Sequence, residues 1–323
     1  MAQAPLLELI HVSKSFPTAR GLVKAVDAVD LQVGPGEAVG LVGESGSGKS
    51  TLARLALGLI APSEGDVRFS GQSIVGLSDR ALKPFRRQAQ MVFQDPYSSL
   101  NPRLRVREII GEALDAHGLA QERRDQRIGE LLDMVGLQAS LSTRYPHEFS
   151  GGQRQRIGIA RALAVEPRVL IADEPVSALD VSVQAQIISL LQDLRRHLGL
   201  SLLLISHDLD VVELLCERVS VLYLGRVMES GLTRHVMQAP RHPYSRALLA
   251  AVPKADPLVT RGARLLSGDI PSPLDPPSGC VFRTRCFYHE PHCAQSRPAL
   301  LPADEPWQVA CHRDPLSVET PPS

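Results

Sequence analysis

The sequence predicts an α/β fold in which a mainly parallel sheet is covered by helices, with an inserted helical subdomain and a small C-terminal domain rich in proline and cysteine. Three observations support this prediction. Short apolar runs alternate with helical patterns as far as about residue 240. A mostly helical pattern with charged segments fills about residues 97–165. From Pro240 onward the composition changes, because 15 of the 25 prolines and four of the five cysteines lie there.

The apolar runs are short and rich in Val, Ile and Leu, as strands buried on both faces are. The expected strands are 6–12, 38–42, 91–93, 169–172, 202–205 and 219–224. One helix is marked by an apolar stripe at helical spacing, formed by Ile187, Leu191, Leu194 and Leu198. Its polar neighbours are expected to face water or a partner: Gln184, Gln192, Asp193, Arg195 and Arg196.

Length and charge limit what the protein can do. With 323 residues there is room for about two domains, which we place at residues 1–240 and 241–323. The 35 basic side chains balance 35 acidic ones, which argues against a basic surface for nucleic acid. The longest uncharged apolar run is far shorter than the roughly 20 residues that cross a bilayer. The N-terminal run is interrupted by Glu8 and has no basic leader, so we expect a cytosolic protein.

Residues 43–51, GESGSGKST, have the spacing of a phosphate-binding loop. They follow the apolar run AVGLV and precede a helix beginning near Lys49, which is the context that the motif requires. Glycines let the backbone N–H groups turn toward phosphates at the positive end of that helix. Lys49 is expected to reach the β and γ phosphates, and Ser50 to bind Mg²⁺. The alternative is a glycine-rich turn. The predicted nucleotide-binding residues are Gly43, Glu44, Ser45, Gly46, Ser47, Gly48, Lys49, Ser50 and Thr51.

The run VLIADEP at 169–175 is an apolar strand that ends in two carboxylates. A carboxylate at the end of a buried strand suits a magnesium ligand at the edge of a parallel sheet, and we assign this role to Asp173. Glu174 is then placed to orient and polarise an attacking water as general base. The alternative is an exposed acidic turn before Pro175.

Three further motifs follow in order: FSGGQRQRIGIARAL at 149–163, SALD at 177–180 and ISHD at 205–208. Together with the phosphate loop and the acidic strand, this order resembles the ATPase subunits of ATP-binding cassette (ABC) transporters over residues 6 to about 240. The resemblance implies a P-loop NTPase (RecA-like) core that binds ATP and Mg²⁺ and hydrolyses ATP to ADP and phosphate. It also implies that two subunits work together, because the signature of one closes over the ATP of the other.

The same resemblance implies roles for individual residues. Those of the signature and the following loop act on the partner's ATP: Ser150, Gly151, Gly152, Gln153 and Asp180. Phe149 stands where the family usually has Leu, which affects packing more than chemistry. Gln94, in MVFQDPYSSLNPR, contacts magnesium and the attacking water, and His207 holds the γ-phosphate. Phe16, in HVSKSF, stacks on adenine. Taken singly, these three also suit a surface amide, a helix-start residue and a core ring.

Several stretches resemble the dipeptide/oligopeptide import subfamily, most of all PRHPYSRALLAAVP at 240–253 and the following LSGDIPSPLDPPSGC. Within this subfamily, the chain most resembles the second ATPase subunit of a dipeptide permease. It implies a motor peripheral to the cytoplasmic face of the bacterial inner membrane. Its implied partners are a second related ATPase subunit, two transmembrane permease subunits and, indirectly, a substrate-binding protein, with no nucleic acid. A homodimer stays open. The cargo also stays open to nickel, glutathione or cationic peptides. Two other functions stay open as alternatives: a soluble ABC ATPase of DNA repair or translation, and a non-enzymatic regulator.

Four cysteines in the tail are separated by five, six and seventeen residues: Cys280, Cys286, Cys293 and Cys311. Because cytosolic chains rarely keep disulfides, this group indicates a metal site. Zinc modules use closer pairs, and four thiolates also suit an iron–sulfur cluster. The resemblance implies similar cysteines in the subfamily, some with a [4Fe–4S] cluster; zinc or free thiols are the alternatives. Spare ligands are His289, His292 and His312, and the arginines that would offset thiolate charge are Arg283, Arg285 and Arg297.

Overall fold

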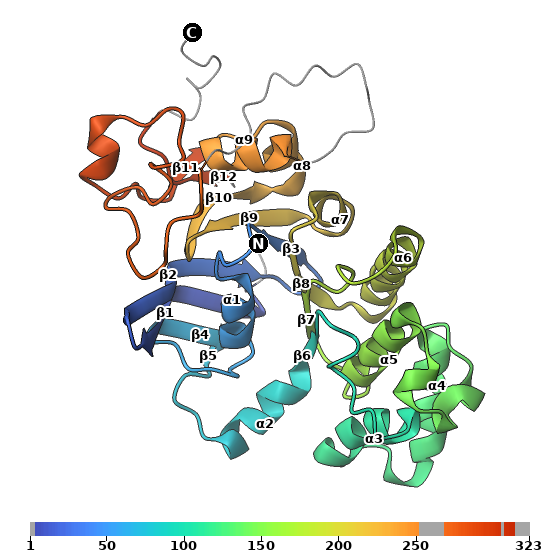
Figure 1. The fold of residues 1–323 in the computed structure, drawn as a ribbon. Coiled ribbons are helices and arrows are strands. Elements are labelled where there is room, and N and C mark those ends of the chain that lie inside the picture. Colours follow the sequence, from blue (N-terminus) through green and yellow to red (C-terminus); the bar gives the residue numbers. More distant parts are fainter. Residues whose placement is uncertain (1–3, 252–267, 305–306, 314–323) are drawn as a thin grey trace.

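The computed structural model describes residues 4–251, 268–304 and 307–313, which form two sheets and the helices packed on them (Figure 1). The larger sheet has eight strands, and its five strands from β9 to β6 are parallel to their neighbours. Three antiparallel strands extend its other edge. In spatial order the strands are β11 (Leu301–Asp304), β12 (Trp307–Val309), β10 (Arg226–Leu232), β9 (Arg218–Tyr223), β3 (Ala38–Val42), β8 (Ser201–Ser206), β7 (Val169–Asp173) and β6 (Ala89–Val92). The predicted parallel sheet is confirmed.

A second sheet of four antiparallel strands lies beside the first. Its order is β2 (Gly21–Val33), β1 (Leu7–Thr18), β4 (Glu64–Phe69) and β5 (Gln72–Ser73). The strand expected at 6–12 exists as part of β1, but it belongs to this sheet and not to the parallel one. Strands β2, β4 and β5 were not predicted. The second half of β2 alternates buried and exposed residues because one face of the sheet meets water, so no continuous apolar run marks it.

The core has two parts, one on each face of the larger sheet. Along β8, Leu202 and Leu204 belong to one cluster, and Leu203 and Ile205 belong to the other. The second cluster includes α1 (Lys49–Ala56), which packs between the two sheets. Successive side chains of a strand point to opposite faces, so a continuous apolar run was the correct signal for a strand covered on both sides.

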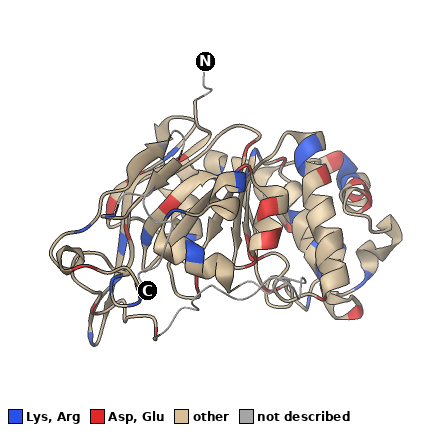
Figure 2. Cartoon of the chain, turned by 90° about the horizontal axis from the view of Figure 1, so that it is seen from above, with Lys and Arg blue, Asp and Glu red and all other residues tan. Residues whose placement is uncertain are grey.

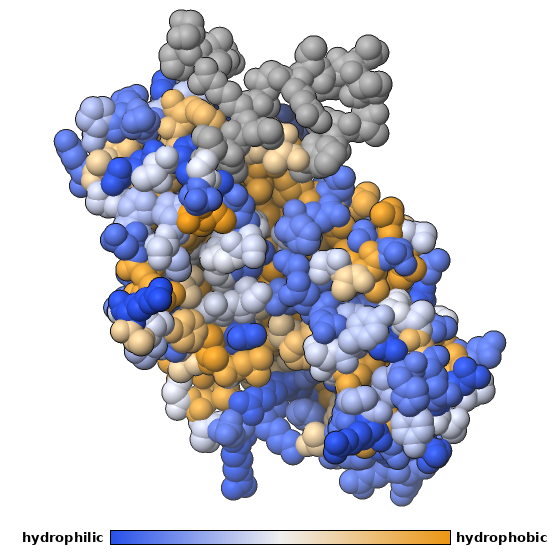
Figure 3. Space-filling view, viewed as in Figure 1, coloured by the Kyte–Doolittle hydropathy of each residue, from blue (hydrophilic) through white to orange (hydrophobic). Residues whose placement is uncertain are grey.

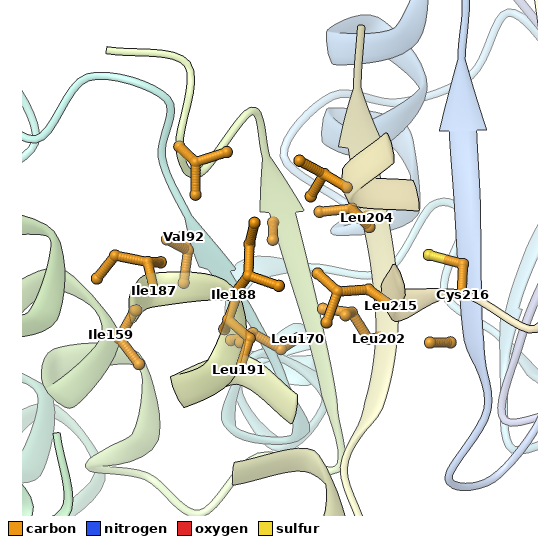
Figure 4. Packing of buried hydrophobic residues seen from close by; sticks show 14 of the residues in the cluster. Val92, Ile159, Leu170, Ile187, Ile188, Leu191, Leu202, Leu204, Leu215 and Cys216 are labelled. Atoms are coloured by element: carbon orange, nitrogen blue, oxygen red, sulfur yellow. The ribbon is translucent and has the colours of Figure 1, made fainter. Parts of the chain in front are cut away.

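Helix α6 (Val181–Leu198) covers the first face of the sheet. Its side chains Ile187, Ile188 and Leu191 lie over β6 and β7, near Val92 and Leu170 (Figure 4). The predicted apolar stripe is wrong only at its last position.

Leu198 is 46% exposed. It is the last helical residue, and the left-handed cap at Gly199 ends the helix there. Two of the polar residues expected to face water or a partner bond carbonyl oxygens at the end of α7 (Leu209–Leu215): Gln192 donates to Leu214 and Arg195 donates to Leu215.

Between β6 and β7 the chain forms a group of helices at the lower right of Figure 1, where mostly hydrophilic residues cover the viewed face in Figure 3. This group contains α3 (Val106–His117), α4 (Arg124–Met134) and α5 (Gly151–Leu163), which pack on one another. The remaining helices are α2 (Asp79–Gln88), α8 (Thr233–Gln238) and α9 (Pro243–Ala250). Among the described residues, no helix combines the length and apolarity that a membrane span needs.

The C-terminal segment shares the core of the α/β part. Strand β12 pairs with β10, and the ring of Phe282 is buried against Tyr223 of β9 and Tyr244 of α9. Charged side chains of both signs are interspersed through the described part of the chain, in keeping with the balanced composition (Figure 2). The domain boundary near residue 240 stays a prediction.

Candidate active site

The loop of residues 43–48 joins β3 to α1, and two of its glycines are required by neighbouring backbone. The φ angles of Gly43 and Gly48 are 153° and 105°. A Cβ on Gly43 would lie 2.1 Å from the carbonyl oxygen of Leu222, and a Cβ on Gly48 would lie 2.3 Å from that of Ala25. Both glycines therefore let the loop pass close to the backbones of β9 and β2, where a residue with a side chain would clash.

Lys49 is the first residue of α1, and its side chain is turned back into the loop. Its Nζ donates to the carbonyl oxygens of Gly43 at 2.7 Å and Glu44 at 2.9 Å. Burial lowers the pKa of Lys49, and the nearby carboxylates of Glu174, Asp173 and Glu44 oppose that shift. The ammonium group is thus held at the centre of the loop, where phosphate groups are expected.

Ser50 and Asp173 meet at the base of the loop. The Ser50 Oγ donates to Oδ1 of Asp173 at 3.3 Å, although the two residues are far apart in sequence. Burial raises the pKa of Asp173, and the hydrogen bond from Ser50 acts against this. A hydroxyl and a carboxylate are the hard oxygen ligands that Mg²⁺ takes, so this pair fits the predicted metal role.

Three predicted residues meet at the Glu174 carboxylate: Glu174 itself, Gln94 and His207. Its Oε2 accepts a hydrogen bond from Nε2 of Gln94 at 2.8 Å and lies 3.3 Å from Nδ1 of His207. The backbone of Glu174 has a φ of 46°, and its N–H donates to the carbonyl oxygen of Ile205 at 2.8 Å.

This convergence follows from the sheet order. Gln94, Glu174 and His207 each follow the carboxyl end of one of three adjacent parallel strands, β6, β7 and β8. The phosphate loop follows β3, which is next to β8. In an open α/β sheet the ends of such strands form the ligand-binding edge.

These residues surround a cleft of about 590 Å³. Val23, Ala25 and Pro273 also line the cleft and were not predicted. No motif marks them, because β2 and the C-terminal segment reach the cleft only through tertiary packing. The predicted residues that line the cleft are Ser45, Gly46, Gly48, Lys49, Ser50, Thr51, Gln94, Glu174 and His207.

Three residues of the phosphate loop do not line the cleft: Gly43, Glu44 and Ser47. The N–H of Glu44 donates to the hydroxyl of Tyr244 at 2.9 Å. In this structure the Glu44 N–H is thus directed at α9, and the nucleotide-binding roles of Gly43, Glu44 and Ser47 stay predictions. Ser47 is buried, and its Oγ has no hydrogen-bond partner among the described residues.

Phe16 is not among the residues that line the cleft. Its ring is 36% exposed, and the Lys14 ammonium lies 5.3 Å from the ring centroid. The residue paired with Phe16 across the hairpin is Val23, which does line the cleft. Residues directly opposite each other in an antiparallel pair share one face of the sheet, so this face of the hairpin reaches the cleft, and the adenine-stacking role of Phe16 stays a prediction.

The signature residues lie at the start of α5, away from the cleft lining. The Ser150 Oγ accepts from the N–H of Gln153 at 3.3 Å, and the Gln153 Oε1 accepts from the N–H of Ser150 at 3.0 Å. This reciprocal cap fixes the helix end. Gly152 packs closely on α6, because a Cβ there would lie 2.3 Å from Cγ1 of Val183. Asp180 is exposed at the start of α6.

All four C-terminal cysteines carry free thiols, and these thiols lie near enough to influence one another electrostatically. Burial raises the pKa values of Cys280, Cys286 and Cys311, that of Cys286 to about 12. The described residues contain no group of three or more His, Cys, Asp or Glu side chains that could hold one metal ion.

The neighbours proposed for the cysteines have other partners. Arg285 is paired with Glu44 and Arg297 with Asp27, while Arg283 donates to the carbonyl oxygen of Ser278. The spare histidines also have contacts of their own. His289 lies 3.2 Å from the carbonyl oxygen of Cys286, His292 lies 3.4 Å from Glu290, and His312 lies 2.9 Å from the carbonyl oxygen of Ser296.

Comparisons with known proteins agree along most of the chain. A family model described as ABC transporter matches residues 26–177, and one described as Oligopeptide/dipeptide transporter, C-terminal region matches residues 228–293. The oligopeptide transport ATP-binding protein AppF of Bacillus subtilis is 49% identical over 321 residues, covering 96% of this chain and 98% of that protein. OppF of Salmonella typhimurium is 51% identical over 308 residues, covering 91% and 92%.

Solved structures show the same fold. The ATP-binding cassette MJ0796, as a dimer in a post-hydrolysis state bound to ADP and Pi, has a TM-score of 0.64 at 32% identity. The match covers 71% of this chain and 99% of that one. CbiO1 of Clostridium perfringens, part of an ABC transporter complex, has a TM-score of 0.65 at 29% identity, covering 72% and 91%.

Proposed function

The chain belongs to the ATPases of the ABC transporter family, and we propose that it is the ATP-hydrolysing subunit of an importer for dipeptides and oligopeptides. Similarity to peptide-transport subunits extends over almost the whole chain, including its C-terminal region. The observation that carries the catalytic part is the convergence of Gln94 and His207 on Glu174, across the cleft from the phosphate loop.

The residues of the cleft divide the work of hydrolysis. The Lys49 ammonium and the start of α1 bind the phosphates of ATP. Glu174 accepts a proton from the attacking water or orients it, and Gln94 keeps the carboxylate directed into the cleft. His207, which lies 3.3 Å from the Glu174 carboxylate, holds the γ-phosphate. When bound, Mg²⁺ neutralises phosphate charge, and Ser50, Asp173 and Gln94 are the residues that would hold it.

The signature works in a dimer. Ser150, Gly151, Gly152 and Gln153 form a capped helix start outside the chain's own cleft, and Asp180 is exposed on the neighbouring helix. These residues would complete the ATP site of a second subunit. The dimeric state of the MJ0796 cassette supports this arrangement. ATP binding then favours the closed dimer, and hydrolysis with phosphate release lets it reopen.

The proposed assembly contains a related second ATPase subunit, two transmembrane permease subunits and a substrate-binding protein that selects the peptide. The subunit would act at the cytoplasmic face of the bacterial inner membrane as a peripheral protein. Its relatives are named for oligopeptide transport, which supports peptides over nickel or glutathione as the cargo.

Growth on peptides tests the transport role. A strain lacking the gene should fail to grow when a required amino acid is supplied only as di- or tripeptides, and the wild-type gene should restore growth. Glu174→Gln should not restore it. Glu122→Gln is the control, because Glu122 is exposed in the turn Gln121–Arg123 and outside the cleft. Growth of the deletion strain on peptides would refute peptide import as the function.

We also propose that the four tail cysteines hold a [4Fe–4S] cluster. Thiolates that share one zinc ion lie about 2.3 Å from it, and no such tight group exists among the described residues. A four-iron cluster is larger, so its ligands are farther apart while still interacting electrostatically, as these thiols do.

Metal analysis of protein purified without oxygen tests this assignment. Iron and acid-labile sulfide should be present at about four per chain. Cys286→Ser should lose them. Cys216→Ala should keep them, because Cys216 lies in the core of the α/β part and not in the tail. A wild-type sample with neither iron nor sulfide would refute the cluster.

A further inference from the structure

Glu44, the second residue of the phosphate loop, is held by two residues from beyond residue 240. Its carboxylate accepts two hydrogen bonds from the Arg285 guanidinium, at 2.7 Å to Oε2 and 3.0 Å to Oε1. Its N–H donates to the hydroxyl of Tyr244 at 2.9 Å. The loop that is expected to bind phosphates is therefore tied to the C-terminal segment through a single acidic residue.

Aromatic rings surround the ion pair between Arg285 and Glu44 and restrict its movement. Arg285 has a side chain that is only 5% exposed, and its Nη1 lies 3.5 Å from the Tyr223 hydroxyl. The ring centroids of Tyr223 and Tyr244 are 4.7 Å apart, and Phe282 lies 5.3 Å from each. A two-point pair between guanidinium and carboxylate fixes orientation as well as charge. Glu44 is thus held in one direction by buried partners.

The charge of Glu44 bears directly on ATP. The carboxylate influences the Lys49 ammonium electrostatically, so it lies within range of the place where phosphates bind. An unpaired carboxylate there would repel a triphosphate and weaken its attraction to Lys49. The guanidinium of Arg285 cancels this charge and holds the carboxylate outside the cleft, whose lining does not include Glu44.

A second observation brings the same segment to the cleft. Pro273 lines the cleft beside Val23 of β2. The next residue, Leu274, has a methyl carbon 3.9 Å from the position that a Cβ on Gly21 would occupy. In Figure 1 the C-terminal segment descends beside β2. The C-terminal segment therefore reaches the ATP cleft at two places, beside the β1–β2 hairpin and at the phosphate loop.

We infer that the C-terminal segment completes the ATP site, with Arg285 as a positioning residue that neutralises Glu44 and so permits tight ATP binding. The inference rests on the proposed ATP site. It gives the proline- and cysteine-rich tail a role in nucleotide binding that does not depend on whether the cysteines carry a cluster.

The test is a charge-rescue experiment on ATP affinity, measured with the fluorescent analogue TNP-ATP on the full chain. Arg285→Met should weaken binding at least about tenfold, because it leaves Glu44 charged and unpaired. Adding Glu44→Gln to that variant removes the charge and should recover affinity to within about threefold of wild type. Arg283→Met is the matched control, since Arg283 belongs to the same segment and its guanidinium donates to the carbonyl oxygen and hydroxyl of Ser278, away from the cleft lining.

A merely structural role for Arg285 predicts a different result, because removing a second partner would not restore a distorted loop. Equal affinity of Arg285→Met and the double variant would overturn the inference. If Arg285→Met does not fold, Arg285→Lys is measured in its place, because lysine keeps a positive charge beside Glu44. An affinity within about threefold of wild type would support the inference, and a loss of more than about tenfold would overturn it.

Lys49→Ala separates this inference from the proposed ATP site. Loss of TNP-ATP binding in Lys49→Ala, together with unchanged binding in the Arg285 variants, would leave the site in place and overturn only the inference. Unchanged binding in Lys49→Ala would contradict the site itself.

Discussion

Replacing Gly152 by alanine should destabilise the protein through one contact between α5 and α6. The added Cβ would lie 2.3 Å from Cγ1 of Val183, whereas carbon atoms in contact are normally about 3.5–4.0 Å apart. Val183 is β-branched and lies in a helix, so its methyl group cannot turn away easily. The two helices must therefore separate.

The magnitude follows from two opposing effects. Overpacking of this kind costs about 1–3 kcal/mol, and alanine gains about 0.5–1 kcal/mol over glycine within a helix. We expect Gly152→Ala to lower the free energy of unfolding by about 1–2 kcal/mol. In a Val183→Ala background the obstructing methyl is absent, so the same change should raise it by about 0.5 kcal/mol.

Urea unfolding of wild type, both single variants and the double variant measures these values. The prediction is a change of sign between the two backgrounds. An equal loss of stability in both would refute the contact with Val183 as the reason for glycine. A double variant of restored stability but without ATP hydrolysis would show that Gly152 is also needed at the partner's ATP.

Two further predictions concern stability. Burial lowers the pKa of His242 to about 3, and its Nδ1 accepts the N–H of Tyr244 at 3.0 Å. The unfolded chain binds a proton at this histidine from about pH 6.5 downward while the folded chain does not, so acidification through that window should lower the free energy of unfolding by about 1.4 kcal/mol per pH unit. Urea titrations at several pH values should show that slope, and His242→Gln should flatten it. In α6, Leu194→Ala should lower the free energy of unfolding by about 2–3 kcal/mol, because Leu194 is only 5% exposed. Leu198→Ala should lower it by less than about 0.5 kcal/mol, because Leu198 is 46% exposed. Similar losses in urea unfolding of the two variants would contradict the placement of the helix end.

The sequence predicts the parallel strands well for a physical reason. Strands buried on both faces appear as continuous apolar runs, and the runs at 38–42, 169–172 and 202–205 match β3, β7 and β8 within a residue or two. Strand β2 was missed because one of its faces meets water, so its apolar residues alternate.

The candidate site was predictable wherever a functional residue follows such a run. Gln94, Glu174 and His207 come just after three parallel strands, so the sheet order brings them together. The contacts of Glu44 were not predictable, since Arg285 lies 241 residues away and no local pattern marks the pair. Val23 was not predictable either, since β2 reaches the cleft only through its pairing with β1, and the role of Phe16, its partner across the hairpin, stays a prediction.

The central claim is that Glu174 acts on the attacking water in an ATP site formed by this chain. The most direct test is ATP hydrolysis by purified Glu174→Gln, measured beside TNP-ATP binding, with Glu122→Gln as the control. We predict that hydrolysis falls at least about 100-fold while binding is retained. Hydrolysis at the wild-type rate by a Glu174→Gln protein that binds ATP would contradict it.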